Sequence, residues 1–178
     1  MGKQSLDRDQ LLKLLAAARG KRERDWLMIL VAFHHGLRAT EVIDIRGDDV
    51  RDGYLAVERL KGSLFTRQPL VRCRDPLLSE AEALFDFARK SNGKQRLFPL
   101  TRQRFWQLVR EYGKVAGLPL HLRHPHILKH SIAMQTIKLA GIENVRQWLG
   151  HKSIASTGEY LRVTDEDASA AVRKALDV

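Results

Sequence analysis

The chain has 178 residues, of which 44% are hydrophobic and 29% are charged, proportions that are ordinary for a globular domain with one buried core. Its 31 Lys and Arg against 21 Asp and Glu give a net charge of +10, which favours a polyanionic partner because basic side chains release counterions from phosphates. A single cysteine excludes an internal disulfide, no apolar run approaches the roughly 20 residues that span a bilayer, and no signal peptide is recognisable. A cytoplasmic protein without a membrane segment is therefore expected.

The first quarter of the chain has the apolar periodicity of helices. Helices are predicted over residues 6–19, 23–35 and 39–45. Ser5 or Asp7 is a suitable N-cap for the first helix, and Gly20 and Gly36 are expected to end the first and the second.

The period then changes to that of a β-sheet. Residues 54–57 and 64–71 are predicted strands, with turns at 51–53 and 61–63. These short segments predict a small antiparallel sheet of two or three strands.

The rest of the chain returns to helical periodicity. Helices are predicted over residues 78–91, 101–117, 126–140, 143–149, 153–160 and 164–176. Ser79 and Thr101 are the expected N-caps of the first two, and Gly117 and Gly141 are expected stops. The fold class is therefore mainly α with a small antiparallel β-sheet (α+β), and residues 1–178 are expected to form one domain.

The histidine-rich stretch HPHILKH raises the possibility of a metal site. His126 and His130 are four residues apart and would share a helix face, as zinc-binding pairs do. However, no Glu stands where a HExxH motif needs one, and nothing in the sequence indicates a third ligand. No metal and no other cofactor is therefore expected, and His124 and His130 are assigned to structure or to contact with a DNA backbone.

Phosphodiester chemistry without a metal requires cations around the phosphate, a nucleophile and a proton donor. Polar residues of these kinds stand at predicted turns and element ends, where exposed chemistry concentrates. They are Arg38, Lys61, His126, Lys129, His151 and Tyr160. Each also has a purely structural interpretation, such as a buried aromatic for Tyr160 or a helix-end surface charge for Arg38.

The order of these residues resembles the tyrosine site-specific recombinases, a family that includes the phage integrases. HGLRATE (35–41) is similar to the first motif, HILKHSIA (126–133) to the second and LGHKSIASTGEY (149–160) to the third. Lys61, in RLKGSLFTRQPL, falls where these enzymes carry a lysine in a turn. The resemblance implies the catalytic-domain fold of that family.

The resemblance also implies a reaction. Tyr160 would attack the scissile phosphate to form a 3′-phosphotyrosyl bond, and Lys61 would protonate the departing 5′-oxygen. His126 would assist proton transfer. DNA would be resealed by a free 5′-hydroxyl, without metal or ATP.

The remaining implied roles concern the phosphate oxygens. Arg38 would clamp the phosphate, His151 would donate a hydrogen bond to it, and Glu41 would orient Arg38. Lys129 stands where the family has its second arginine, and a lysine offers a compact ammonium in place of a two-pronged donor. One alternative is therefore a DNA-binding regulator with weakened or lost catalysis. Another is an enzyme that shares the chemistry but nicks and relaxes DNA like a type IB topoisomerase.

The implied partners are double-stranded DNA and further copies of the chain. A monomer is expected in isolation and a homo-tetramer on synapsed DNA, with accessory DNA-bending proteins as possible partners. Residues 164–178 are expected to form a helix that packs either in cis or on a neighbour. No separate N-terminal DNA-binding domain is expected, and HHGLRATE with RLKGSLFTRQPL resembles the short recombinases that invert fimbrial genes.

Overall fold

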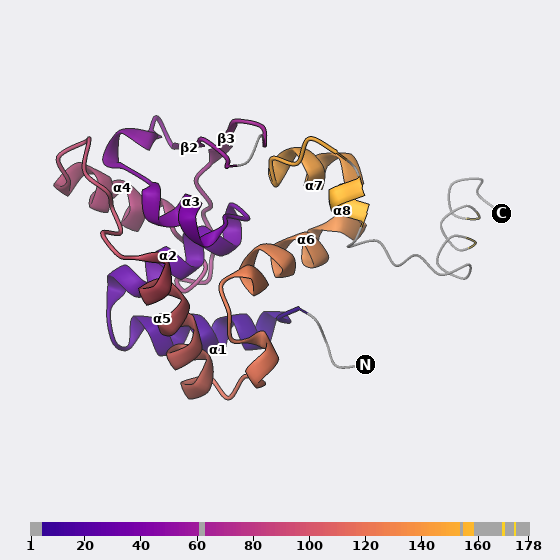
Figure 1. Ribbon diagram of the computed structural model, residues 1–178, viewed down its shortest axis with the longest axis horizontal. Coiled ribbons are helices and arrows are strands. Elements are labelled where there is room, and N and C mark those ends of the chain that lie inside the picture. Colours follow the sequence, from indigo (N-terminus) through magenta and orange to yellow (C-terminus); the bar gives the residue numbers. More distant parts are fainter. Residues whose placement is uncertain (1–4, 61–62, 154, 159–168, 170–172, 174–178) are drawn as a thin grey trace.

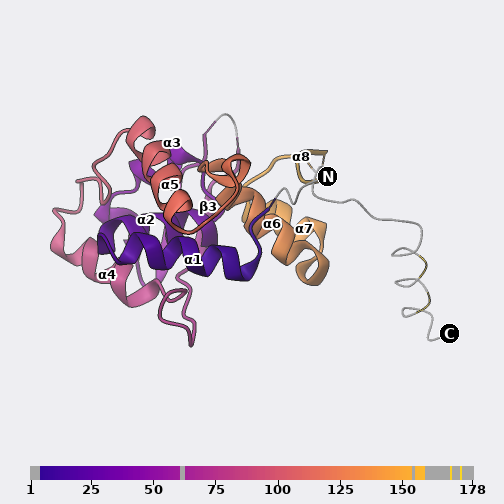
Figure 2. The ribbon, with the colours of Figure 1, turned by 90° about the horizontal axis from the view of Figure 1, so that it is seen from below.

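The computed structural model describes residues 5–60, 63–153, 155–158, 169 and 173, and helices dominate this part of the chain (Figure 1). Helix α2 (Glu23–His34) lies at the centre, and every residue from Asp25 to His34 is buried. A helix that is apolar on all sides belongs inside a core. Helix α1 (Arg8–Arg19) packs along α2, and α6 (His126–Ala140) also packs against it (Figure 2).

Local capping explains where several helices begin and end. Asp7 accepts a hydrogen bond from the backbone of Gln10 and completes a capping box at the start of α1. Thr101 accepts from Arg104 at the start of α5 (Arg102–Val115). Gly117, which follows α5, has a φ of +70°, the left-handed conformation that ends helices. These predicted boundaries are confirmed.

The prediction that Ser79 caps the next helix is wrong. Helix α4 (Ala81–Lys90) begins only after Glu80. The Glu80 side chain is directed inward, where it is hydrogen-bonded to His34 and His35 and accepts from the backbone of Val71. Glu80 itself is the N-cap of α4, and no local periodicity shows its long-range bonds.

The predicted antiparallel sheet is present, with three strands. They are β1 (Val50–Arg51), β2 (Tyr54–Val57) and β3 (Thr66–Pro69), in the order β1-β2-β3. Leu55 pairs with Gln68, and Val57 pairs with Thr66. All four of these side chains are buried, so the inner face of the sheet is apolar on β2 and polar on β3.

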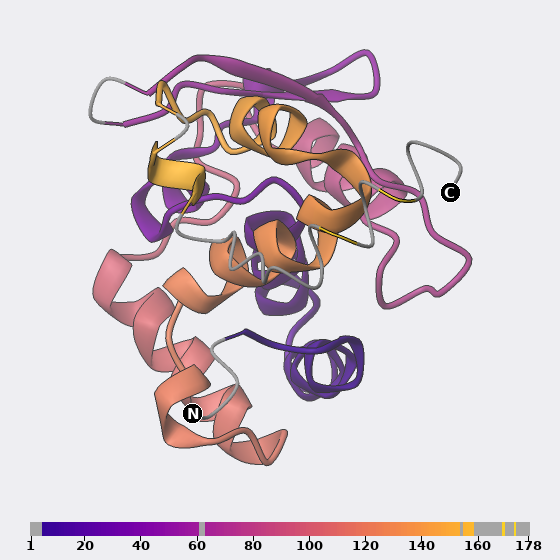
Figure 3. The same ribbon diagram turned by 90° about the vertical axis from the view of Figure 1, so that its right-hand side faces the viewer.

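Two hydrophobic clusters divide the molecule. The larger includes residues of α1 to α5, of the sheet and of the first turn of α6. The smaller consists of Ala133, Ile137, Val145 and Leu149, which pack α7 (Ile142–Trp148) onto the second half of α6. Figure 3 shows α7 below the β2–β3 hairpin, consistent with the contacts between α7 and β3.

Short 3₁₀ helices, η1 (Gly47–Asp49) and η2 (Leu120–Leu122), were not predicted. α3 (Ala39–Asp44) and α8 (Ala155–Gly158) complete the described elements. Across the described ranges, none of the helices combines the length and the apolar character needed to cross a membrane. The helix predicted over residues 164–176 falls almost entirely outside the described residues.

Candidate functional site

The candidate site is built on two turns that come from distant parts of the chain. We call residues 35–38, after α2, the first turn, and residues 148–151, at the end of α7, the second turn. Each contains a glycine in the left-handed region, with φ +57° at Gly36 and +68° at Gly150. A Cβ on Gly36 would lie 2.4 Å from Cδ2 of Leu149. The two turns therefore pack against each other so closely that a side chain at position 36 would displace Leu149.

Lys129 connects the two turns. Its Nζ donates to the carbonyl of Gly36 at 2.9 Å and to that of Leu149 at 3.1 Å. The side chain is 1% exposed, although lysine is rarely buried. Burial and, to a smaller extent, the positive charge of Arg59 lower the pKa of Lys129 to about 7, while Glu41 opposes the shift.

Arg59 makes a second connection, and the sequence analysis did not identify it. Its guanidinium donates to the carbonyls of His35 at 2.9 Å, Gly36 at 3.1 Å and Trp148 at 3.1 Å. It also donates to Thr66 Oγ1 at 3.0 Å. All of the Arg59 side chain is buried.

A pattern in the sequence could have indicated Arg59. Leu55 and Val57 face inward, and in a strand every second residue shares a face. Arg59 continues this alternation, so a charged residue stands at an inward position. A charge at such a position requires buried partners, and the two turns supply them.

Arg38 and Glu41 form an ion pair. Arg38 is the N-cap of α3, its Nη1 donates to Glu41 Oε1 at 2.8 Å, and its backbone N–H donates to Oε2 at 2.7 Å. The side chain of Arg38 is 34% exposed, whereas that of Glu41 is fully buried. The buried Glu41 thus orients the guanidinium of Arg38, and part of the Arg38 side chain remains accessible to a ligand.

Glu41 is surrounded by positive charge. Burial alone would raise its pKa, but the backbone N–H of Arg38 and the charges of Lys129 and Arg59 outweigh burial and lower it. One carboxylate therefore faces three cationic side chains. The excess positive charge suits this region to an anion such as a phosphodiester.

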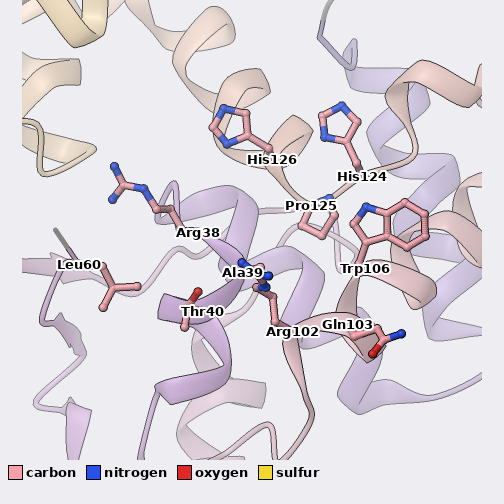
Figure 4. Close-up of a pocket in the computed structure, with 10 residues that line it drawn as sticks. All are labelled: Arg38, Ala39, Thr40, Leu60, Arg102, Gln103, Trp106, His124, Pro125 and His126. Atoms are coloured by element: carbon pink, nitrogen blue, oxygen red, sulfur yellow. The ribbon is translucent and has the colours of Figure 1, made fainter.

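His126 lies at the start of α6, beside Arg38. Both line a pocket of about 770 Å³ whose other walls include Trp106, Arg102 and His124. Figure 4 shows Arg38 and His126 toward one end of the pocket and Trp106 toward the other. Burial, which disfavours the charged form, lowers the pKa of His126, and the positive charges of His124 and Lys129 act in the same direction.

His151 occupies the end of the second turn and is 7% exposed. Its Nδ1 lies 3.0 Å from Oγ1 of Thr157 in α8, and its carbonyl accepts from Arg146 at 2.9 Å. Burial, followed by the positive charges of Lys129 and Arg38, lowers the pKa of His151 to about 4. The imidazole is therefore neutral at pH 7.

The structure places five of the predicted site residues in one region. They are Arg38, Glu41, His126, Lys129 and His151. Lys61 and Tyr160 lie outside the described residues. Within the ranges that the structure describes, no group of three or more His, Cys, Asp and Glu side chains could hold a metal ion.

Comparisons with known proteins identify the family of the chain. The model of the phage integrase family matches residues 4–167. Tyrosine recombinase XerA of Pyrococcus furiosus is 30% identical, over 96% of this chain and 61% of that protein. Type 1 fimbriae regulatory protein FimB of Escherichia coli K12 is 31% identical, over 77% of this chain and 72% of that protein.

The chain spans about three fifths of the length of its XerA relatives. Among solved structures, XerH bound to its difH substrate has a TM-score of 0.76 at 21% identity, covering 96% of this chain and 54% of that one. A lambda integrase dimer bound to a COC′ core site has a TM-score of 0.71 at 23% identity, covering 90% and 49%. The predicted catalytic-domain fold is confirmed, and the chain belongs to the phage integrase family.

Proposed function

We propose that this chain is the catalytic domain of a site-specific recombinase, which cuts and rejoins double-stranded DNA through a 3′-phosphotyrosyl intermediate. One observation carries the proposal. The first and the third motif form two turns in contact, and Arg38, backed by Glu41, opens from them into a pocket shared with His126. A phosphate bound there would face Arg38 of the first turn and His126 at the start of α6.

The proposed cleavage begins at Tyr160. Its hydroxyl oxygen attacks the phosphorus, the bond from phosphorus to the 5′-oxygen breaks, and Lys61 supplies the proton that the departing oxygen needs. His126 takes part in moving the tyrosine proton. A 5′-hydroxyl from another strand then attacks the phosphotyrosine and reverses these steps, so the number of phosphodiester bonds is conserved.

The described cations would stabilise the transition state. Arg38 binds two phosphate oxygens with its planar fork, since Glu41 fixes its orientation from the opposite side. Lys129 supplies positive charge from beneath the two turns. Because these groups are already in place before substrate binds, they need little reorganisation during the reaction.

DNA and further copies of the chain are the proposed partners. Solved relatives include a lambda integrase tetramer bound to a Holliday junction and XerH bound to difH. The net charge of +10 agrees with a DNA partner. We propose that the chain assembles as a tetramer on synapsed sites, with residues 164–178 packing between neighbours and DNA-bending proteins assisting where the site requires it.

Covalent capture tests the proposal. The chain is incubated with a library of nicked suicide duplexes that carry a randomised centre, and protein–DNA adducts are recovered on a denaturing gel. We expect an adduct that is absent in Tyr160→Phe and strongly reduced in Arg38→Ala. Selective, tight binding from the same library with no adduct would contradict the enzyme and support a regulator.

The regulator is the second candidate, and Lys129 favours it. Both hydrogen bonds of its Nζ go to backbone carbonyls, and its pKa is lowered to about 7, so its charge is less available to a phosphate than that of an arginine. Lys129→Arg separates the candidates. For a weakened enzyme we expect adduct formation to increase by about ten- to a hundredfold, the equivalent of one charge-assisted hydrogen bond, with DNA affinity unchanged. No increase would mean that Lys129 does not limit the reaction.

A further inference from the structure

Thr157 is a buried polar residue for which the proposed reaction has no role so far. It lies in α8, is 0% exposed, and its Oγ1 is 3.0 Å from Nδ1 of His151. In the sequence it stands three residues before Tyr160. The contact therefore joins the segment that leads to the proposed nucleophile with the histidine of the second turn.

The direction of this hydrogen bond decides what His151 can do. A neutral imidazole has one ring nitrogen that donates and one that accepts, whereas a threonine hydroxyl can do either. If Thr157 donates to Nδ1, the proton of His151 is on Nε2, which can then donate to a phosphate oxygen. If Nδ1 donates to Thr157, Nε2 has a lone pair and repels that oxygen.

The surroundings of His151 disfavour a third possibility, the doubly protonated ring. Lys129, Arg38 and Arg59 act on His151 with positive charge, and only Glu41 opposes them. Together with burial they keep the imidazole neutral at pH 7. The tautomer of a neutral ring is linked to the direction of its hydrogen bond, and in the described structure the partner at Nδ1 is Thr157.

We propose that Thr157 is a positioning residue that donates its hydroxyl proton to Nδ1 and so holds His151 as the neutral Nε2–H tautomer, the form that donates to the scissile phosphate. This inference rests on the proposed function of His151. Because Thr157 belongs to α8, the packing of α8 against the second turn also sets the tautomer of His151. His151 therefore becomes a hydrogen-bond donor to the phosphate only when α8 is packed there.

The first test reads the proton position directly, without any DNA. Ring nitrogens with and without a proton differ widely in ¹⁵N chemical shift, so long-range ¹H–¹⁵N correlation spectra of the full chain at pH 7 report the tautomer, with His151→Gln assigning the signals. We expect a single Nε2–H form in the native chain. Thr157→Val keeps the shape but removes the hydroxyl, and we expect a mixture of tautomers; Thr157→Ser restores the Nε2–H form.

The second test measures the consequence for cleavage. We expect Thr157→Val to slow adduct formation by about three- to tenfold, as for the loss of one neutral hydrogen bond, with DNA affinity unchanged and with recovery in Thr157→Ser. Thr136→Val is the matched control, since Thr136 donates within α6 to Ile132 at 2.7 Å. It should change neither the tautomer nor the rate.

The outcomes separate this inference from the proposed function. An Nδ1–H tautomer in the native chain, or an unchanged tautomer in Thr157→Val, overturns the inference even if adducts form. A changed tautomer with an unchanged rate limits Thr157 to structure and also overturns it. If the native chain forms no adduct with any duplex, the proposed function fails, while the spectra still decide whether Thr157 sets the proton of His151.

Discussion

The two turns of the site perform similar tasks but are supported very differently. The first turn follows α2, the most deeply buried helix, and its His35 is hydrogen-bonded at both ring nitrogens, to Gln68 at 2.9 Å and to Glu80 at 2.6 Å. The second turn follows α7, which rests on a hydrophobic cluster of only four buried residues. Local stability increases with the number of buried apolar contacts, so we expect the second turn to have a lower free energy of local unfolding than the first.

Polar side chains anchored in the larger core hold the second turn in place. Arg59 and Lys129 reach from the larger core to carbonyls of both turns, and Gln68 adds a bond from its Nε2 to the carbonyl of Trp148 at 2.7 Å. The indole N–H of Trp148 donates to the backbone carbonyl of His34 at 2.8 Å. The second turn therefore depends on polar connections to the first, and removing those connections should affect it most.

Arg59→Met should have the largest effect. It leaves the carbonyls of His35, Gly36 and Trp148 without this donor and Glu41 without one of its cations. Removing one partner from a buried charged network typically costs about 3–5 kcal/mol, which urea unfolding of the variant should show. Arg72→Met is the control, because its pair with Glu82 is exposed and should contribute less than about 1 kcal/mol. Equal stability of the two variants would mean that Arg59 does not hold the turns together.

Gly36→Ala tests the close contact between the turns. The left-handed φ costs about 1–2 kcal/mol for a residue with a Cβ, and overpacking against Leu149 adds about 1–3 kcal/mol. Gly117→Ala separates the two contributions, since φ is +70° there and nothing lies within 4 Å of the added Cβ. We expect the unfolding free energy to fall by clearly more in Gly36→Ala, and equal losses would show that the turns are not in tight contact.

The pH dependence of stability tests the ammonium that joins the turns. The pKa of Lys129 falls from 10.5 in the unfolded chain to about 7 in the folded one. Between these values the unfolded state binds more protons, so stability rises with pH. Relative to Lys129→Met, the native chain should gain on the order of 2 kcal/mol from pH 7 to 9, because each pH unit above the folded pKa contributes up to about 1.4 kcal/mol.

Urea unfolding at a series of pH values measures this effect. Lys90→Met removes an exposed lysine at the end of α4 and should leave the curve parallel to that of the native chain. A native curve parallel to that of Lys129→Met as well would mean that the folded protein keeps the Lys129 ammonium fully charged across this range.

The elements of the fold could be predicted because their causes are local. Asp7 and Thr101 cap their helices within three residues, and Gly36 and Gly117 end theirs by φ alone. The positions of Arg38 and Glu41 also follow from local spacing, three residues apart at the start of α3.

The connections of the site could not be predicted, because they join residues that are far apart in the chain. Arg59 meets Trp148 across 89 positions, and Lys129 meets Gly36 across 93. Glu80 resembled an ordinary helix-start residue, yet His35 and His34 offset the cost of its burial and lower its pKa to about 2. Periodicity identifies which side of an element is buried, but not which residues that side contacts.

The β2–β3 hairpin has a consequence for the length of the sequence. Leu60 donates its backbone N–H to Glu41 at 3.2 Å, and Leu64 donates its own to the carbonyl of Gly150 at 2.9 Å. Each residue spans at most about 3.6 Å, so the number of positions between these anchors limits the distance that the chain can cover from one motif to the other. The hairpin therefore sets the spacing between the first and the third motif. Substitutions at 61–63 change the side chains that the hairpin presents, whereas a single insertion or deletion there would change the spacing itself.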